Sequence, residues 1–386
     1  MVEDVFRGGR RYWATLGLLA LVILAGLLAY GRQLALGLQI TGMGRDVSWG
    51  LYISQFTFLV GVAASAVMVV LPYYLHHYKA FAKTVILGEF LAVSAVLMCM
   101  LFVFVDMGQP GRVLNILLYP RLNSIMFWDL LVLTGYLGLN LVIGAVTIEA
   151  ERMDVAPPRW IRPLIYLSIP WAVSIHTVTA FLYAGLKARP FWMTAILAPR
   201  FLASAFASGP SLLILLALLL RRTTKFDVGR EAISKLATIV TYAMIVNLFF
   251  VLVELFTTLY GGIPHDVASF AYLFTGLGGR AALAPWMWVG EWLTVVTVAL
   301  LLVPRVRARD GALALVCAGV IAAIWIEKGL AMVVTGFIPT PLGHVTQYVP
   351  TLPEVAIALG IYAVGGFTLT VLYKLVLGVR ARAAVA

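Results

Sequence analysis

The sequence predicts an all-α polytopic integral membrane protein with about ten transmembrane helices. Hydrophobic residues make up 62% of the 386 residues and charged residues only 12%. Apolar windows of about 20 residues, the length that crosses a bilayer, recur along the whole chain. The segments between them are too short to form a second globular domain, so we expect one membrane domain over residues 1–386. The windows are 12–30, 49–75, 84–105, 125–148, 162–184, 201–220, 236–260, 285–303, 312–334 and 353–377.

The distribution of basic residues predicts the orientation of the spans. An even number of spans puts both termini on one side, and 19 of the 28 Lys and Arg residues fall in loops on that side. By the positive-inside rule, both termini are cytoplasmic and the chain is a multi-pass protein of the cytoplasmic (inner) membrane. The net charge of +11 therefore needs no nucleic-acid partner. The nine other basic residues are Arg32, Arg45, Arg112, Arg121, Lys187, Arg189, Arg200, Arg280 and Lys328.

A weak internal repeat connects two of the spans. The sequence FLVGVAASA begins at Phe58 and FLASAFASG begins at Phe201, and small residues at such spacing allow close helix contact. We expect two parallel four-helix repeats, 49–184 and 201–334, with 12–30 and 353–377 as flanking helices. Chance similarity is the alternative, since Ala and Ser are common in spans.

The sequence contains no ligand set for a metal or haem. The two Cys residues, Cys99 and Cys317, lie in separate apolar runs and form no CxxC pair. Of the five His residues only His176 is expected to lie well inside the membrane, whereas an intramembrane haem with two axial His ligands needs a facing pair. We therefore expect no metal site, no intrinsic haem and no iron–sulfur cluster.

Ionisable residues fall at similar depths on five different spans. Counting 1.5 Å per residue from the span ends puts them in one layer of the outer half, where charged groups are costly and usually functional. We interpret the layer as a polar cavity that opens outward, and separate structural pairs are the alternative. In the inner half, Glu89 is the clear counterpart. The layer contains Asp129, His176, Glu254, Glu291 and Glu327.

The stretch from Asp106 to Asp129 reads DMGQPGRVLNILLYPRLNSIMFWD and interrupts the apolar pattern. Its two Gly and two Pro residues break a regular helix, and polar irregular backbone near a membrane must be buried in protein or face water. It is either the lid and wall of a ligand site or an ordinary capped connection between two spans.

Several motifs carry a resemblance to a known family. They are the Trp49–Gly50 pair before a span, GVAAS at Gly61–Ser65, DMGQPGR at Asp106–Arg112, and the Asn-Ser pair within 121–128. With these motifs the chain resembles the NrfD/polysulfide-reductase membrane-subunit (PsrC-like) family over most of its length. The run from Pro170 to Pro210 is similar to the DsrP branch, which belongs to the DsrMKJOP complex of dissimilatory sulfur metabolism.

The resemblance implies a subunit that binds quinone near the outer face, with menaquinone expected. It has no redox centre of its own and exchanges electrons with an extracytoplasmic iron–sulfur subunit of a respiratory oxidoreductase. The branch implies DsrO-like iron–sulfur, DsrJ-like multihaem cytochrome c, DsrM-like haem-b membrane and DsrK-like cytoplasmic iron–sulfur partners. Some relatives hold quinone with a His or Asn on the first family span. This chain has Gln55 in that region.

We therefore expect quinone chemistry supported by titratable side chains. Quinone reduction takes two protons, so a proton donor is needed near each carbonyl, and His176 serves one side with Asp129 or Tyr183 on the other. Arg112 and Arg200 would stabilise negative charge on the ring, and Asp106 and Gln55 complete the quinone candidates. The proton-transfer candidates are Glu254, Glu291, Glu89 and Glu327.

Two alternatives of other classes remain at this stage. A secondary transporter of a small anion predicts charges near the bilayer centre and broken helices there. A redox-inactive membrane anchor predicts no ligand pocket and tolerance of changes at His176.

Overall fold

The computed structural model describes residues 5–6, 8–224 and 226–383. Every named regular element in these ranges is a helix, and ten helical segments are long and apolar enough to cross a membrane. Each overlaps one predicted window, which confirms the all-α polytopic fold. The spans are Arg10–Leu36, Leu51–Leu75, Lys79–Asp106, Ile125–Arg152, Ile161–Ala184, Leu197–Thr223, Arg230–Gly261, Ala284–Leu302, Asp310–Thr335 and Leu352–Arg380.

The longer helices are the spans, and shorter pieces either continue them or lie in the connections. In chain order the α-helical elements are α2 (Arg10–Leu36), α3 (Leu51–Ala63), α4 (Val67–Leu75), α5 (Ala82–Asp106), α6 (Asn115–Leu118), α7 (Ile125–Arg152), α8 (Ile161–Ala184), α9 (Leu197–Thr223), α10 (Arg230–Gly261), α11 (Pro264–Phe274), α12 (Ala284–Leu302), α13 (Pro304–Arg307), α14 (Asp310–Ile324), α15 (Met332–Thr335) and α16 (Leu352–Ala383). The 3₁₀ turns are η1 (Leu38–Ile40), η2 (Ala64–Ala66), η3 (Lys79–Phe81), η4 (Pro110–Arg112) and η5 (Pro190–Trp192), and η6 (Trp325–Ala331) is π-helical.

The ends of the spans follow ordinary capping chemistry. Helix α10 ends at Gly261, and Gly262 adopts a φ of +61°, a left-handed conformation that glycine takes without a Cβ penalty. Its N–H still donates to the carbonyl of Thr258 at 3.1 Å. Pro264 then begins α11, where its fixed φ fits the first helical turn and its missing N–H costs nothing.

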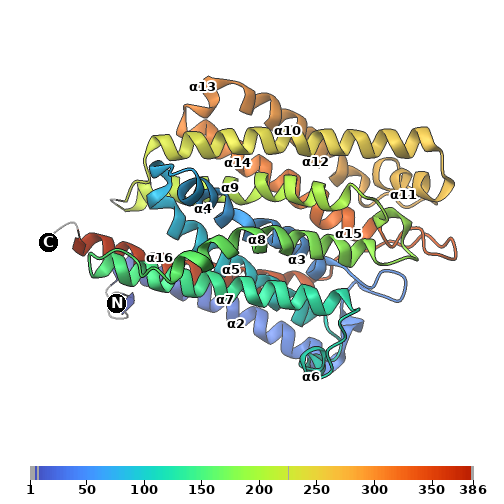
Figure 1. Ribbon diagram of the computed structural model, residues 1–386. Helices are drawn as coiled ribbons and strands as arrows, with labels where there is room; N and C mark the ends of the chain where they lie inside the picture. The colour runs from blue at the N-terminus through green and yellow to red at the C-terminus, as the bar shows by residue number, and fades with distance from the viewer. Residues whose placement is uncertain (1–4, 7, 225, 384–386) are drawn as a thin grey trace.

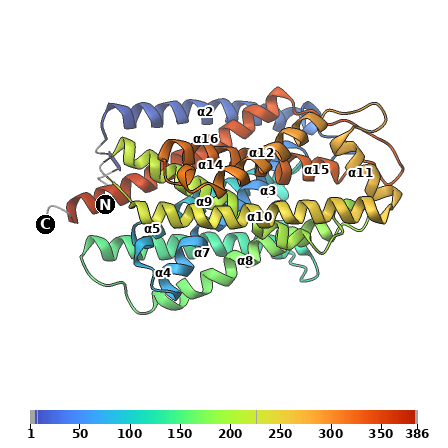
Figure 2. The same ribbon diagram turned by 90° about the horizontal axis from the view of Figure 1, so that it is seen from above.

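The spans lie side by side along one long axis (Figures 1 and 2). Helix α2 begins and α16 ends at the same end of the molecule, which we call the terminal face, and α11 lies at the opposite end, the distal face. The connections 37–50, 107–124, 185–196, 262–283 and 336–351 belong to the distal face. The even number of spans thus brings both ends of the helical domain to one side, as predicted.

The helices associate in two groups of four spans. The first group contains α3–α4, α5, α7 and α8, and the second contains α9, α10, α12 and α14 with its extension η6–α15. Helices α3 and α9 meet at the seam between the groups. A Cβ on Gly61 would lie 3.5 Å from the Cα of Ala205, and a Cβ on Gly209 would lie 3.0 Å from the Cα of Ser65. The two segments with similar sequences therefore pack against each other through their small residues.

The flanking helices α2 and α16 pack mainly against each other, and α16 also covers α5. Glycines make the closest contact: a Cβ on Gly26 would lie 2.7 Å from the Cα of Gly360, and one on Gly360 would lie 2.8 Å from the Cα of Gly26. Only glycine at both positions allows the two backbones to approach this closely.

The connection 107–124 lies on the distal face beside η1, where a Cβ on Gly108 would touch Leu38. It contains only the short elements η4 and α6, as its Gly and Pro residues predicted. Leu114, Leu117 and Leu118 are more than half exposed. The segment is therefore an outlying surface feature of the distal face (Figure 1).

Candidate functional site

One polar cluster lies in the second group of helices, where Arg200 of α9 joins two carboxylates. Its Nη1 donates to Glu254 of α10, while Nε and Nη2 donate to Oε1 of Glu327 at 3.1 and 2.5 Å. Asn247, two turns before Glu254 on α10, donates to Oε2 of Glu327 at 3.1 Å. The side chains of the ion pairs are at most 13% exposed. We call these four residues the Arg200 cluster.

Glu291 of α12 adds a further carboxyl group to this region. Its Oε1 is buried and has no hydrogen-bond partner, and the charges of Glu327, Arg200 and Glu254 act on it. One guanidinium group therefore faces three carboxyl groups. Excess negative charge is costly in an apolar layer, and a carboxyl group that binds a proton lowers it. This region is suited to holding and releasing protons.

The free space at the Arg200 cluster is too small for a ring-shaped ligand. About 20 Å³ is open to water there, between the ionic side chains and apolar ones such as Phe270 and Met287. That is enough for about one water molecule and far below the roughly 300–1,000 Å³ of typical ligand pockets. The cluster fits a role with protons and water.

A second set of polar side chains lies on one buried face of α8 in the first group. His176, Thr179 and Tyr183 follow at the three- and four-residue spacing that aligns side chains on a helix. Thr179 donates from Oγ1 to Oδ1 of Asp129 on α7 at 2.7 Å, and the hydroxyl groups of Tyr183 and Thr57 are hydrogen-bonded at 2.5 Å. His176 is completely buried, and neither of its ring nitrogens has a hydrogen-bond partner. We call His176, Thr179 and Tyr183, together with their partners Asp129 and Thr57, the α8 face.

Aromatic rings cover the distal end of the α8 face. Tyr183 packs edge-on against Trp192 at 5.0 Å and against Trp49 at 5.5 Å, measured between ring centroids. Trp49 stacks on Trp192 at 5.8 Å, and Phe337 packs edge-on against both tryptophans. The indole of Trp192 donates to the carbonyl of Met332 at 3.0 Å, which fixes its position. These rings form an apolar floor.

A hollow of about 460 Å³ opens above this floor on the distal face, a size within the range of small-molecule pockets. Arg189 and Lys187 are its charged groups. The Arg189 guanidinium lies 4.5 Å from the ring centre of Phe337 and donates to the carbonyl of that residue at 3.2 Å. Burial lowers the pKa of Arg189, and the nearby Asp46 carboxylate acts in the opposite direction. The hollow is lined by Ser48, Trp49, Gly185, Leu186, Lys187, Ala188, Arg189 and Phe337.

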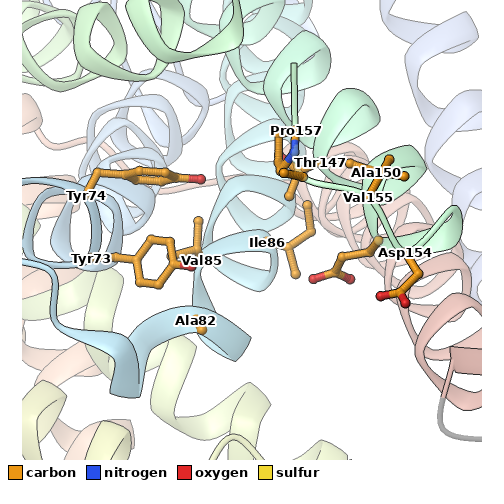
Figure 3. A pocket seen from close by; sticks show the side chains of 12 residues that line it. Tyr73, Tyr74, Ala82, Val85, Ile86, Thr147, Ala150, Asp154, Val155 and Pro157 are labelled. Carbon is orange, nitrogen blue, oxygen red and sulfur yellow. The ribbon is translucent and has the colours of Figure 1, made fainter. Parts of the chain in front are cut away.

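A separate hollow of about 370 Å³ opens at the terminal end of the first group (Figure 3). Tyr73 and Tyr74 stand on one side and Asp154 on the other, with Ile86 of α5 between them. Glu89 lies about one turn further along α5, is completely enclosed, and has no hydrogen-bond partner for its Oε2. An unpaired carboxyl group thus lies just below a hollow at the terminal face.

The other predicted site residues lie elsewhere. The carbonyl oxygen of Gln55 accepts hydrogen bonds from the indole of Trp325 at 2.7 Å and from the hydroxyl of Tyr362 at 2.6 Å, so it ties α3 to η6 and α16. Asp106 ends α5 at the distal face, and Arg112 is exposed in the following connection. The charge of Asp106 acts on Tyr183 of the α8 face, whereas Gln55 and Arg112 are not brought to that face.

The structure also adds polar residues that the sequence reasoning did not select. Thr57 and Thr179 are the direct partners of Tyr183 and Asp129. Helical spacing from His176 points to Thr179, whereas the contact with Thr57 depends on how α3 and α8 pack. Lys328 is 4% exposed and lies beside Glu327 in the π-helical segment. The sequence pattern alone offers Lys328 only its neighbour Glu327 as an ion-pair partner.

Comparisons with known proteins agree on one family. A family model described as "Polysulphide reductase, NrfD" matches residues 39–339. A protein of Halobacterium salinarum, described as a candidate membrane subunit of dimethyl sulfoxide reductase, is 27% identical over 91% of this chain and 88% of its own length. A selenate reductase subunit of Mesobacillus selenatarsenatis is 24% identical over 82% of this chain and 80% of its own length. The Hdr-like menaquinol oxidoreductase integral membrane subunit of Archaeoglobus fulgidus is 24% identical over 68% of this chain and 65% of its own length.

Proposed function

Because this chain belongs to the polysulphide reductase NrfD family, we propose that it is the quinone-interacting membrane subunit of a respiratory oxidoreductase complex. The names of three relatives support this proposal, since two are reductase subunits and the third is a menaquinol oxidoreductase subunit. Menaquinone is therefore the quinone that we propose.

The observation that carries the proposal is the placement of His176, Asp129 and Tyr183 beneath the aromatic floor of the distal hollow. The hollow is large enough for a quinone ring, and the flat side chains of Trp49 and Phe337 suit one. A bound quinone supplies two-electron, two-proton chemistry. The donors of the α8 face would supply the protons, and the aromatic floor would keep bulk water out.

The α8 face provides a descending series of proton-carrying groups. Tyr183 lies nearest to the distal end of α8, and its hydroxyl is bonded to Thr57. The Asp129–Thr179 pair lies one turn deeper and His176 a further turn deeper, about 10 Å below Tyr183. We propose that Tyr183 donates to the ring and that Asp129 and His176 restore its proton. Proton transfer by a positioned side chain typically contributes about 10²–10⁴-fold to a rate.

We further propose that proton movement involves carboxyl groups outside the α8 face. Glu254, Glu291 and Glu327 lie with one guanidinium group and space for about one water, which suits them to hold protons. Glu89 below the terminal hollow is the proposed entrance from that side.

The proposed setting is a complex in the cytoplasmic membrane, with the terminal face in the cytoplasm and the distal face outside. The quinone would exchange electrons with an extracytoplasmic iron–sulfur subunit docked on the distal face. A DsrMKJOP-like complex of sulfur metabolism, with DsrO-, DsrJ-, DsrM- and DsrK-like partners, is the specific form that we propose from the sequence motifs.

The test combines ligand identification with one substitution. The complex is purified anaerobically and its bound quinone is extracted and identified by mass spectrometry. We expect bound menaquinone and a fall of about 10²-fold in quinone-dependent turnover for His176→Ala. His76→Ala, at an exposed position of the terminal face, is the control and should retain wild-type turnover.

Two results would overturn the proposal. Unchanged turnover in an assembled His176→Ala complex would remove His176 from the proton series. A complex that neither contains nor turns over quinone would favour the redox-inactive anchor.

A further inference from the structure

Lys328 is a buried cation at the seam between the two helix groups. It is 4% exposed, and its Nζ donates one hydrogen bond, to the carbonyl of Phe201 at 3.3 Å. The same atom lies 4.3 Å from the ring centre of Phe201, which provides some cation–π stabilisation. An ammonium group has three donors, so two of them lack a protein partner. Lysines inside membrane spans are costly and usually functional, so this position needs an explanation.

The π-helical segment η6 directs two neighbouring charged residues into different surroundings. Glu327 joins the Arg200 cluster of the second group, whereas Lys328 points to the seam between α3 and α9. Glycines on both elements allow η6 to approach α3 closely. On α3, a Cβ on Gly61 would lie 3.3 Å from the Nζ of Lys328, and on η6, a Cβ on Gly329 would lie 3.1 Å from the carbonyl of Ser54. Single π-helical turns often occur at functional sites.

Titratable groups from both helix groups surround Lys328. His176 of α8 and Cys99 of α5 lie within range of its charge on the first-group side. Glu327 and Arg200 act on it from the second-group side. His176 has two buried nitrogens without a partner, and Lys328 has two unmet donors. Internal water is the usual partner of buried polar groups left in this state.

We propose that Lys328 is a proton relay between the Arg200 cluster and His176. The proposal rests on the proposed quinone function. Each proton that leaves the α8 face for a quinone oxygen is replaced by one from Lys328. Lys328 recovers a proton through Glu327, which takes it in turn from the unpartnered carboxyl group of Glu291. The electrons come from the iron–sulfur partner, so the relay moves protons only. It would make the carboxyl groups of one helix group the proton store for chemistry in the other.

The test uses two substitutions at Lys328 that differ in one property. Lys328→Met removes the charge and the titratable group, whereas Lys328→Arg keeps the charge but cannot release a proton in a protein. We expect both variants to assemble and to retain bound quinone, and both to turn over quinone at least about 10²-fold more slowly than wild type. Lys374→Met is the control, because Lys374 also lies over a ring, that of Tyr12 at 5.5 Å, but on the flanking helix α16.

Wild-type turnover by Lys328→Arg would overturn the relay and leave Lys328 as a fixed positive charge. If either variant fails to assemble, a measurement on the wild-type protein decides. The chain has seven lysines, so an NMR spectrum with ¹³C labels at the ends of the lysine side chains contains few signals. The Lys328 signal is the one that is absent from the Lys328→Arg spectrum or that shifts in Gly61→Ala.

The relay requires this signal to change protonation state within the pH range in which the complex works. A signal that remains that of an ammonium group throughout would overturn the relay. This result does not depend on quinone activity, so it separates failure of the relay from failure of the proposed function.

Discussion

Arg200 and Glu327 lie 127 residues apart in the sequence and are joined by two hydrogen bonds of 2.5 and 3.1 Å. This contact connects the distal start of α9 to the π-helical segment after α14. Because the same guanidinium group also binds Glu254, one side chain holds three helices of the second group together. Substitution of Arg200 therefore changes both the charge balance of the cluster and the packing of these three helices.

We predict that Arg200→Met destabilises the protein by about 3–5 kcal/mol, since it leaves buried carboxylates without their cation. The measurement is thermal unfolding of the purified protein in detergent. Arg221→Met is the matched control, because Arg221 pairs with the more exposed Asp310 on the terminal side. Exposed pairs contribute about 0–1 kcal/mol, so equal losses in the two variants would contradict the structural role assigned to Arg200.

The orientation of the spans predicts opposite compartments for the two faces. A reporter fused after the end of α16 should report the cytoplasm, and one inserted into 107–124 should report the outside. An insertion into 153–160, between α7 and α8, should match the C-terminal fusion. The same signal from 107–124 and from the C-terminal fusion would contradict the ten-span topology.

Substitution of the carboxyl groups tests proton movement. Glu254→Gln and Glu291→Gln should each lower proton uptake during quinone turnover in liposomes that contain a trapped pH dye, because a glutamine amide does not take up or release protons near neutral pH. Glu231→Gln, at a terminal-face carboxyl that accepts from the Tyr78 hydroxyl at 2.6 Å, is the control. Normal rate and proton stoichiometry in both variants would leave Glu254 and Glu291 with a structural role.

Glu354 is predicted to be essential for the order of the distal connections. It is completely buried and accepts from the Gly42 N–H at 2.7 Å, the Tyr348 hydroxyl at 2.7 Å and the Thr351 N–H at 2.8 Å. Burial, and next the charge of Glu354, raise the pKa of Tyr348 above its usual value, so its hydroxyl remains a donor. Hydrogen bonds to charged groups contribute about 1.5–3 kcal/mol each.

Glu354→Ala should therefore lower stability by at least about 3 kcal/mol and expose residues 41–49 to protease. Tyr348→Phe removes one donor to Glu354 and should cost less. Protease resistance of Glu354→Ala equal to that of wild type would show that other contacts hold this connection.

The ten spans could be predicted because a bilayer sets both the length and the composition of a crossing helix. The ends were less predictable. The first window was 12–30, but α2 continues to Leu36 because Gln33 is satisfied by accepting from the Tyr52 hydroxyl and donating to the Val105 carbonyl. A polar residue appears in the sequence as the end of an apolar run, and only the packed structure shows its partners.

The candidate site was predictable in depth but not in direction around each helix. Counting residues placed Glu254 and Glu327 at similar depths, and the structure joins them through Arg200. The same counting cannot separate the α8 face from the Arg200 cluster. Gln55 became a quinone candidate through the family resemblance, and in the structure its carbonyl accepts from Tyr362 of α16. The π-helical turn that separates Glu327 from Lys328 has no sequence signal of its own.

The repeat of two four-helix units remains a prediction, and the packing of α3 on α9 through Gly61 and Gly209 supports it. In that scheme Thr57 and Arg200 occupy equivalent positions, since Phe58 aligns with Phe201. The first unit then has a hydroxyl where the second has a guanidinium group, which agrees with the different chemistry proposed for the two.

The glycine contact between α2 and α16 has a consequence for biogenesis. Helix α2 is synthesised before the other nine described spans, whereas its main partner α16 begins more than 300 residues after α2 ends. At about 5–20 residues per second, α2 waits roughly 15 to 60 s before α16 is made. During that time the Gly26 surface faces lipid or the insertion machinery. Among the described spans, the packing of α16 on α2 is thus a late step, which follows the synthesis of the eight spans between them.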